Sequence, residues 1–279
     1  MSDVAQGTIP ESGRLAVLGA GKLGEALIRG LIEAGVVRAQ DVTVTAGHPD
    51  RVAQLTGALG VRGAASNAEA ARGAGTLILS VKPQTVAAVL ADLRGVIQPS
   101  QLLVSVAASV GTAFIEKHLD RPVPVIRAMP NTPALIRKGM TALAAGRHAT
   151  HEHVEAALHL FRPLGRTVIV DEKHMDAVTA LSASGPAFIY IVIESLAEGG
   201  VKVGLPRALA TELAAQTVLG AGAMVLETGE HPAKLKDLVT TPAGCTIDGI
   251  LELEEGGLRV TLIKTIVRAT QRAKELLES

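Results

Sequence analysis

Residues 14–35 read RLAVLGAGKLGEALIRGLIEAG, and this stretch decides the fold class of the first half of the chain. It opens with an apolar run, Leu15 to Leu18, which is typical of a short buried strand. A Gly-x-Gly-x-x-Gly motif follows directly, made by Gly19, Gly21 and Gly24. After it, leucines recur every four residues and predict a helix that ends at a glycine: Leu23, Leu27, Leu31 and Gly35. This order predicts a loop in which Gly19 permits the turn, Gly21 admits a pyrophosphate and Gly24 lets helix and strand pack.

The same alternation of strand and helix continues to about residue 170. Apolar runs predict further strands at residues 42–45, near 61, and at 76–81, 102–107, 123–128, 140–145 and 167–170. Helical patterns separate most of them, near residues 50–59 and 66–74, from Pro83 onward, and near 111–118 and 150–161. Such alternation predicts an α/β fold with a doubly wound, mostly parallel sheet, whose ligands lie beyond the carboxyl ends of the strands. The residues expected at those ends are Ser80, Lys82, Ala107, Met129 and Asn131.

The end of the second strand bears on the choice of cofactor. Enzymes that use NAD usually carry an Asp or Glu there, which binds the ribose hydroxyls. This chain has Ala46-Gly47-His48-Pro49-Asp50-Arg51 instead, and no acid stands at the expected position. The lack of the acid, together with His48 and Arg51, favours NADPH and leaves NADH open.

The second half of the chain has a helical period throughout. Helices are expected up to Gly199-Gly200, from Pro206 to about Leu226, and at residues 231–238, 246–255 and 258–277. Gly220 and Gly222 suggest a close contact between helices. Apolar helices in about a hundred residues expose more surface than one small bundle buries, which predicts a dimer built through them. We therefore expect a tail at residues 1–13, a dinucleotide-binding domain at 14–172 and a helical dimerisation and substrate-binding domain at 173–279.

Residues 237–249, DLVTTPAGCTIDG, form a threonine-rich turn before a helix. Gly244 allows a close approach of the backbone to a ligand. The amides of Gly244, Cys245 and Thr246 are expected to be free at the helix start, where the helix dipole favours an anion. The turn therefore predicts a site for a small carboxylate, although an ordinary capped helix has the same pattern.

Composition excludes several classes of protein. The 279 residues carry 27 basic and 27 acidic side chains, so clustered positive charge for nucleic acid or an anionic membrane is not expected. No apolar run approaches the ~20 residues that span a bilayer, and the first 13 residues lack the apolar core of a signal peptide. Cys245 is the only cysteine, which excludes an internal disulfide. These features predict a cytoplasmic protein.

Seven segments together carry a resemblance that covers nearly the whole chain from Arg14. They are VLGAGKLGEALIRG, SVKPQ, SVAASV, RAMPNTP, DAVTALSASGPAF, GLPRALATELAAQTVLGAG and LKDLVTTPAGCTIDG. In this order they resemble the pyrroline-5-carboxylate reductases, which reduce the C=N bond of a cyclic imino acid with NAD(P)H in the last step of proline biosynthesis. The resemblance implies a Rossmann domain, a helical dimerisation domain and a homodimer, and it leaves open whether dimers assemble further into a decamer.

The resemblance also implies roles for individual residues. Around the cofactor it implies the glycines of the loop and the following positions: Gly19, Gly21, Lys22, Leu23, Gly24, Asn67, Ser80, Lys82, Ala107, Ala108 and Asn131. Around the substrate carboxylate it implies Thr241, Gly244, Cys245 and Thr246. Thr246 is also implied to bond the imine nitrogen. Because a threonine hydroxyl is a poor acid at neutral pH, we expect Thr246 to orient an imine that is already protonated.

The chain departs from the family pattern at a few positions. Thr241-Pro242-Ala243-Gly244-Cys245 stands where the family usually has Ser-Pro-Gly-Gly followed by Thr or Ala, and Ala183 replaces a usual glycine. Ala243 restricts backbone angles that glycine allows. The loop after the second strand, Gly47-His48-Pro49, also differs, and this bears on the cofactor preference.

Other hypotheses remain open at this point. Cys245 at a helix start could be a nucleophile, but no histidine is near it in sequence. The histidines of HATHEHVEAALH, residues 148–159, match no spacing of a zinc site, so we expect no metal. Lys82 before Pro83 suits a cofactor contact better than a Schiff base. A reductase of a six-membered cyclic imine and a dinucleotide-binding oligomer without activity are the broader alternatives, and the threonine-rich turn disfavours a third, a β-hydroxy acid enzyme.

Overall fold

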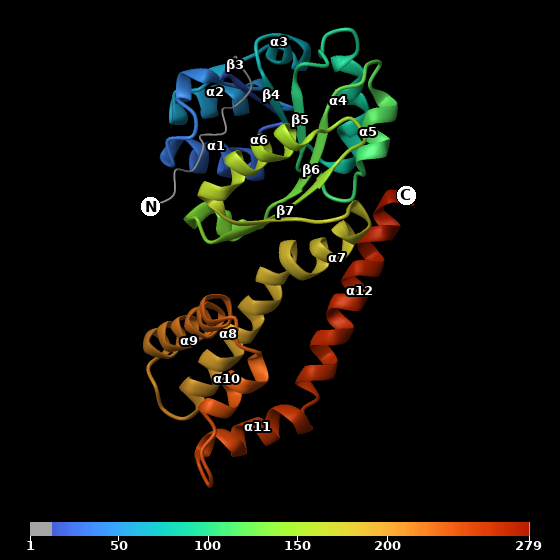
Figure 1. Ribbon diagram of the computed structural model, residues 1–279. Coiled ribbons are helices and arrows are strands. Elements are labelled where there is room, and N and C mark those ends of the chain that lie inside the picture. The colour runs from blue at the N-terminus through green and yellow to red at the C-terminus, as the bar shows by residue number, and fades with distance from the viewer. Residues whose placement is uncertain (1–12, 279) are drawn as a thin grey trace, which may run out of the picture. The chain divides into compact units, whose positions relative to one another are not determined.

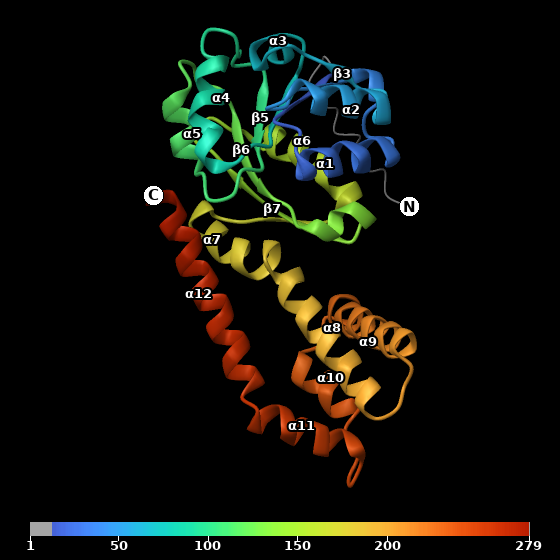
Figure 2. The ribbon, with the colours of Figure 1, turned by 180° about the vertical axis from the view of Figure 1, so that it is seen from behind.

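The computed structural model describes residues 13–278, and its first part is built on a sheet (Figures 1 and 2). The strands are β1 (Leu15–Leu18), β2 (Val42–Val44), β3 (Arg62–Gly63), β4 (Thr76–Leu79), β5 (Leu102–Ser105), β6 (Val125–Met129), β7 (Gly139–Ala145) and β8 (Gly165–Ile169). Their order is β3-β2-β1-β4-β5-β6-β7-β8, and only the β6–β7 pair is antiparallel. The expected α/β fold with a mostly parallel, doubly wound sheet is confirmed.

Helices cover both faces of this sheet (Figures 1 and 2). They are α1 (Lys22–Glu33), α2 (Pro49–Leu59), α3 (Asn67–Arg72), α4 (Val86–Leu93), α5 (Thr112–His118) and α6 (His151–Phe161). Alternate residues of β1 enter opposite cores, as the two-residue period of a strand requires. Val17 packs in the core that α1, α2 and α6 cover, whereas Leu18 packs in the core that α3, α4 and α5 cover. Both faces are apolar, so the strands read as continuous hydrophobic runs.

The chain reverses its direction across the sheet between β1 and β4. It passes from β1 outward to β2 and β3 and then returns to the other side of β1, where β4 pairs with it. At such a reversal the loops after neighbouring strands separate and leave a crevice beyond their carboxyl ends. The glycine-rich loop follows β1 at this point, so the topology positions it at the crevice.

After β8 the chain is helical, as the sequence predicts. The helices are α7 (Met175–Val178), a π-helical turn (Thr179–Ala183), α8 (Gly185–Lys202), α9 (Arg207–Thr228), α10 (Pro232–Leu238), α11 (Cys245–Glu255) and α12 (Leu258–Glu278). Contacts divide the chain into a sheet unit, which comprises the described residues up to Ala183 and those from Thr270, and a helical unit, Ser184–Ala269. The sequence pattern changes earlier, after residue 172, because the strands stop there, whereas Met175 still packs in a core with Met129 of β6.

One expectation about glycines in the helical unit is wrong, and another is not met within a single chain. Gly199 and Gly200 do not end a helix, because α8 continues to Lys202. A Cβ at Gly200 would come within 3.0 Å of the Ala210 Cβ, so this glycine serves close packing between α8 and α9. Gly220 and Gly222 have no atom of the described residues within 4 Å of such a Cβ. Within one chain the close helix contact therefore lies at Gly200, and a contact of Gly220 or Gly222 with a second copy stays a prediction.

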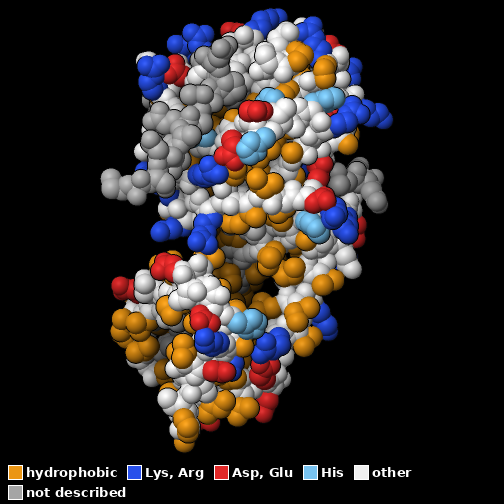
Figure 3. All heavy atoms as spheres, in the orientation of Figure 1, with side chains coloured by type: hydrophobic (Ala, Val, Ile, Leu, Met, Phe, Trp, Pro, Cys, Tyr) orange, Lys and Arg blue, Asp and Glu red, His pale blue; other side chains and the backbone are white. Residues whose placement is uncertain are grey.

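The helical unit buries few of its large side chains. Its buried residues are small: Ala197, Ala210 and Ala214. Hydrophobic side chains remain on its surface (orange in Figure 3), among them Ile191, Leu196, Leu213, Leu219 and Leu253. Two continuous helical segments, Glu172–Lys202 (which includes α7, the π-helical turn and α8) and Arg207–Thr228 (α9), are long and apolar enough to cross a membrane by length and composition alone. That criterion is weak, because any long apolar helix that packs against another protein surface also meets it.

Candidate functional site

The glycine-rich loop after β1 has the geometry that its sequence predicts. Gly19 has φ 78°, and a Cβ there would meet the Val81 Cγ1 at 2.1 Å, so only glycine fits. A Cβ at Gly24 would lie 3.2 Å from the Ser80 Oγ, which shows how closely α1 packs on the strand ends. At Gly21, by contrast, the nearest atom to such a Cβ is 3.9 Å away. The loop is tight on the sheet side and open at Gly21, as a group that approaches the backbone requires.

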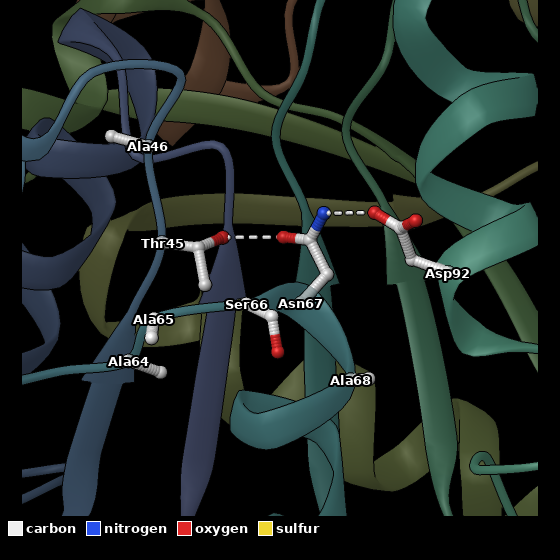
Figure 4. A pocket seen from close by; sticks show the side chains of 8 residues that line it. All are labelled: Thr45, Ala46, Ala64, Ala65, Ser66, Asn67, Ala68 and Asp92. Atoms are coloured by element: carbon white, nitrogen blue, oxygen red, sulfur yellow. Dashed lines mark hydrogen bonds between the residues drawn. The ribbon is translucent and has the colours of Figure 1, made fainter.

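A cavity of about 320 Å³ lies beside this loop (Figure 4). Its lining comes from the end of β2, the segment after β3, the start of α3 and one residue of α4, and comprises Thr45, Ala46, Ala64, Ala65, Ser66, Asn67, Ala68 and Asp92. Small side chains dominate this lining, and the polar atoms converge on Asn67. A small group with several hydrogen-bonding atoms, such as a nucleoside, fits these walls, because most of their exposed surface is polar.

A chain of hydrogen bonds connects the cavity to the glycine-rich loop. The Gly19 amide donates to the Thr45 Oγ1 (3.2 Å), and this hydroxyl donates to the Asn67 Oδ1 (2.6 Å). The Asn67 Nδ2 in turn donates to the Asp92 Oδ2 (2.9 Å), as the dashed lines in Figure 4 show. The reverse orientation of the Asn67 amide would place its oxygen 2.9 Å from a carboxylate oxygen, with no proton between them. Asp92 therefore fixes the direction in which Asn67 presents its amide.

Sequence reasoning missed Thr45 and Asp92. Thr45 directly follows β2, a position where ligand-binding side chains are expected, and this signal could have identified it. Asp92 lies within α4, where nothing in the helical pattern distinguishes it from a solvated carboxylate. From the sequence, an acidic residue was considered only at the end of β2. The acidic residue that lines this cavity, Asp92, comes from α4 instead.

His48 and Arg51, which the sequence associates with NADPH, lie at the start of α2. His48 is exposed and precedes the first residue of α2. The Arg51 Nη2 lies 2.6 Å from the Glu25 Oε2 of α1, and the same guanidinium reaches the carbonyl oxygens of Ala20 and Gly21. Its hydrogen bond to Glu25 holds the pKa of that carboxyl below its usual value, and Arg29 acts in the same direction. Whether His48 and Arg51 contact a cofactor stays a prediction.

The other expected cofactor residues lie around the carboxyl ends of the strands. Ser80 follows β4 and is half-buried, Lys82 is exposed before the 3₁₀ turn Pro83–Thr85, and Ala107 and Ala108 follow β5. Asn131 has both ends of its amide engaged. Its Oδ1 accepts from the Met140 amide (2.8 Å), and its Nδ2 donates to the Ser182 carbonyl (3.2 Å). Asn131 thus orders the segment after β6.

A charged cluster centres on the buried side chain of one arginine of β6. Arg127 of β6 is 2% exposed and faces Glu172 (3.7 Å) and Asp176 (3.5 Å). Glu172 also accepts hydrogen bonds from the Thr112 amide and hydroxyl at the start of α5 (2.7 and 2.5 Å). The Arg127 Nε has no hydrogen-bond partner among the described residues. Arg127 and Glu172 therefore connect β6, α5 and the segment before α7.

The threonine-rich turn of the helical unit has a defined backbone. The Gly244 amide donates to the Thr241 carbonyl (3.0 Å), and Ala243 has φ 59°. This hydrogen bond, with Pro at the second position and a positive φ at the third, is the pattern of a type II turn. A Cβ at Gly244 would lie 2.4 Å from the Thr241 Oγ1, so this hydroxyl is folded over Gly244.

One expectation about this turn is wrong. The Gly244 amide is not free, because the turn itself uses it. Among the described residues, the amides of Cys245 and Thr246 at the start of α11 have no such acceptor. An anion at this turn would therefore meet two free amides and the positive end of the α11 dipole.

The structure describes the surroundings of the residues in two rival hypotheses, a metal site and a catalytic thiol. Within residues 13–278, no three His, Cys, Asp or Glu side chains gather as metal ligands would. His153 has a role in capping α6 instead, because its Nδ1 accepts from the Thr150 amide (3.0 Å). The Cys245 thiol is exposed.

Comparison with known proteins gives the same picture along the whole chain. A family model for pyrroline-5-carboxylate reductase dimerisation matches residues 172–276, and a model for NADP oxidoreductase, coenzyme F420-dependent, matches residues 14–109. The pyrroline-5-carboxylate reductase of Methanosarcina acetivorans is 45% identical over 95% of this chain and 98% of its own length. That of Escherichia coli is 36% identical over 95% of this chain and 99% of its own.

Solved structures agree with these relatives. A pyrroline-5-carboxylate reductase from Coxiella burnetii superposes with a TM-score of 0.87 and 34% identity over 94% of this chain and 98% of its own. The Plasmodium falciparum pyrroline carboxylate reductase, solved with NADP bound, gives a TM-score of 0.86 at 27% identity over 95% of this chain and 98% of its own. On the evidence of the glycine-rich loop, the threonine-rich turn and these near-complete matches, the chain belongs to the pyrroline-5-carboxylate reductase family.

Proposed function

We propose that this chain reduces the C=N bond of 1-pyrroline-5-carboxylate to give L-proline, with NAD(P)H as the hydride donor. The observation that carries this function is the identity of 36–45% to reductases of this name along nearly the full length of both chains. The reaction is the last step of proline biosynthesis, and it makes the chain an oxidoreductase that acts on a C=N bond.

The sheet unit supplies the cofactor site in this proposal. Its opening at Gly21 admits a pyrophosphate, and the cavity between Thr45 and Asp92 admits the adenosine. When bound, NADPH or NADH supplies a hydride from its nicotinamide ring. The residues proposed to contact it are Gly19, Gly21, Lys22, Leu23, Gly24, His48, Asn67, Ser80, Lys82, Ala107, Ala108 and Asn131, and Arg51 is proposed to support the loop that holds it. We assign NADPH as the preferred donor because no acid stands at the end of β2.

The threonine-rich turn supplies the substrate site. The amides of Cys245 and Thr246 donate to the carboxylate of the imino acid, at the start of an 11-residue helix whose dipole favours the negative charge. The Thr241 hydroxyl lies over Gly244 and borders the same site. The role of Gly244 is conformational, since its own amide closes the turn and a side chain there would displace Thr241.

The chemistry assigned to Thr246 is orientation. Its hydroxyl bonds the imine nitrogen, which carries a proton when the substrate arrives, and holds the imine carbon towards the hydride donor. The hydride adds to that carbon, the electron pair of the C=N double bond moves to nitrogen, and the positive charge of the iminium disappears. The product is the secondary amine of proline. Thr246 gives up no proton in this scheme.

The assembly follows from the apolar helices. The dimerisation model covers the stretch that contains α8 to α11, so a second copy of the chain accounts for the surfaces that one copy leaves exposed. We propose a homodimer in the cytoplasm, with α8 and α9 covered by protein and not by a bilayer, and with no nucleic acid as partner. Assembly of such dimers into a decamer is the finer form of this proposal.

The test is oxidation of the cofactor, followed by nicotinamide absorbance, with 1-pyrroline-5-carboxylate and either NADPH or NADH. Rapid turnover, faster with NADPH, is expected. Lack of turnover with both cofactors, from protein that is folded and oligomeric, would overturn the function. A six-membered cyclic imine assayed in parallel distinguishes the nearest alternative substrate.

A further inference from the structure

Arg51 carries an unusually full set of hydrogen bonds for a residue expected to hold a phosphate. Its Nε donates to the Ala20 carbonyl (3.3 Å), and its Nη1 donates to the Gln54 Oε1 (2.7 Å). Its Nη2 donates to the Gly21 carbonyl (3.4 Å) and to the Glu25 Oε2 (2.6 Å). A guanidinium has five N–H groups, so four are engaged within the chain. One remains, which is too few for the paired contact that Arg makes with phosphate.

The bonds to the two carbonyls place Arg51 on one side of the glycine-rich loop. In a planar trans peptide the carbonyl oxygen and the next amide hydrogen point in opposite directions. A guanidinium that holds the Gly21 carbonyl therefore turns the Lys22 amide away from itself. Lys22 is the first residue of α1, where the amides that receive a pyrophosphate are found. Arg51 thus braces the loop from behind the side that receives the ligand.

Glu25 keeps Arg51 in this position. It lies one turn into α1, and its two carboxylate oxygens bind Arg51 and Arg29 (2.6 and 3.1 Å). The Arg51 and Glu25 side chains are 25% and 28% exposed, so the pair is shielded in part from solvent. The negative charge of Glu25 also offsets the attraction that Arg51 would exert on a cofactor phosphate.

We propose that Arg51 is a positioning residue for the dinucleotide, held by Glu25, which sets the affinity for NADPH and NADH equally and does not select between them. This inference rests on the proposed cofactor site. It assigns cofactor preference to groups other than Arg51. This differs from the expectation from the sequence, in which Arg51 is the first Lys or Arg after β2, where a 2′-phosphate is expected.

The test measures the dissociation constants of NADPH and NADH by calorimetry for the wild type, Arg51→Lys, Arg51→Gln and Glu25→Gln. Lysine keeps the charge of Arg51 but lacks the fork that reaches both carbonyls. A loop that these bonds no longer hold must be ordered when the cofactor binds, which we expect to weaken binding by about tenfold. Both Arg51 variants should therefore weaken NADPH and NADH by a similar factor, and Glu25→Gln should weaken both to a smaller extent. Arg29→Gln removes the other cation of Glu25 and serves as the control that leaves both affinities near the wild-type values.

A comparison of kinetic constants separates positioning from general destabilisation. With saturating cofactor, kcat of the variants should stay close to wild type while KM for the cofactor rises, because the nicotinamide end is untouched. Selective loss of NADPH binding in Arg51→Gln, restored in Arg51→Lys, would overturn the inference, as would unchanged binding of both cofactors. If Arg51→Gln does not fold, Glu25→Gln decides, since tighter binding of NADPH alone would also overturn it. Failure of the wild type to bind either cofactor would instead overturn the proposed function.

Discussion

The sheet unit and the helical unit differ in how far they bury their hydrophobic side chains. In the sheet unit, large side chains such as Leu27, Ile78 and Phe161 are at most 1% exposed, because helices cover both faces of the sheet. In the helical unit, Ile191 and Leu219 are 61% and 56% exposed, and the buried residues are alanines. The first unit closes its core within one chain. The second has its apolar faces available for another copy, as its match to a dimerisation family indicates.

The largest expected effect tests this difference at the exposed face. Ile191→Glu should shift the protein from dimer to monomer, because burial of one such side chain is worth about 1.5–3 kcal/mol and twofold symmetry counts it twice. The dimer should weaken by at least about 100-fold, as measured by sedimentation velocity over a concentration series. Ile136→Glu, at a more exposed position of the sheet unit (73%), is the matched control. An unchanged sedimentation profile for Ile191→Glu would contradict the comparison.

The second effect tests the closed core of the sheet unit. Arg127→Met leaves Glu172 and Asp176 without their buried cation, and because both carboxylates keep some contact with solvent we expect a loss of about 1.5–3 kcal/mol of unfolding free energy. Urea denaturation followed by circular dichroism should show this loss. Arg162→Met removes the exposed pair with Glu155 (3.3 Å) and should cost at most about 1 kcal/mol. Equal losses in the two variants would mean that burial does not distinguish the two pairs.

A third experiment separates the two units by function. Asn67→Ala should raise KM for the cofactor about tenfold and leave KM for the imine unchanged, because Asn67 lines only the cavity of the sheet unit.

Thr246→Ala should lower kcat/KM for the imine by about ten- to 100-fold, as expected for a lost hydrogen bond to a charged group. Its turnover should fall without vanishing. Complete inactivity of correctly folded Thr246→Ala would indicate that Thr246 does more than orient the imine.

The smallest effect concerns the turn of the helical unit. Ala243 has φ 59°, a conformation that costs an L-residue about 1–2 kcal/mol and a glycine almost nothing. Ala243→Gly should relieve this strain, but the freer unfolded chain offsets about half of the gain. We expect a net stabilisation below about 1 kcal/mol in thermal unfolding, with KM for the imine unchanged or lower. Destabilisation would show that the turn does not hold Ala243 in the left-handed region.

Much of the fold was predictable because its signals are local. The run before Gly19, the glycine spacing and the leucine period predicted β1, the loop and α1, and the structure shows them within a residue or two. The Pro242-Ala243-Gly244 sequence likewise predicted a turn before a helix. The end of α8 was not predictable in this way, because Gly200 reads as a helix end in sequence and serves close packing against Ala210 in the fold.

In the candidate site, too, local features were predictable from the sequence and contacts between distant residues were not. The sequence by itself determined which backbone segments are candidates for ligand binding, since the φ that Gly19 adopts and the dipole of α11 follow from neighbours in the chain. Only the tertiary structure decided the partners: Glu25 for Arg51, 26 residues away, and Asp92 for Asn67, 25 residues away. The physical reason is that conformational preference acts over a few residues. A hydrogen bond depends on which atoms the folded chain brings within about 3 Å.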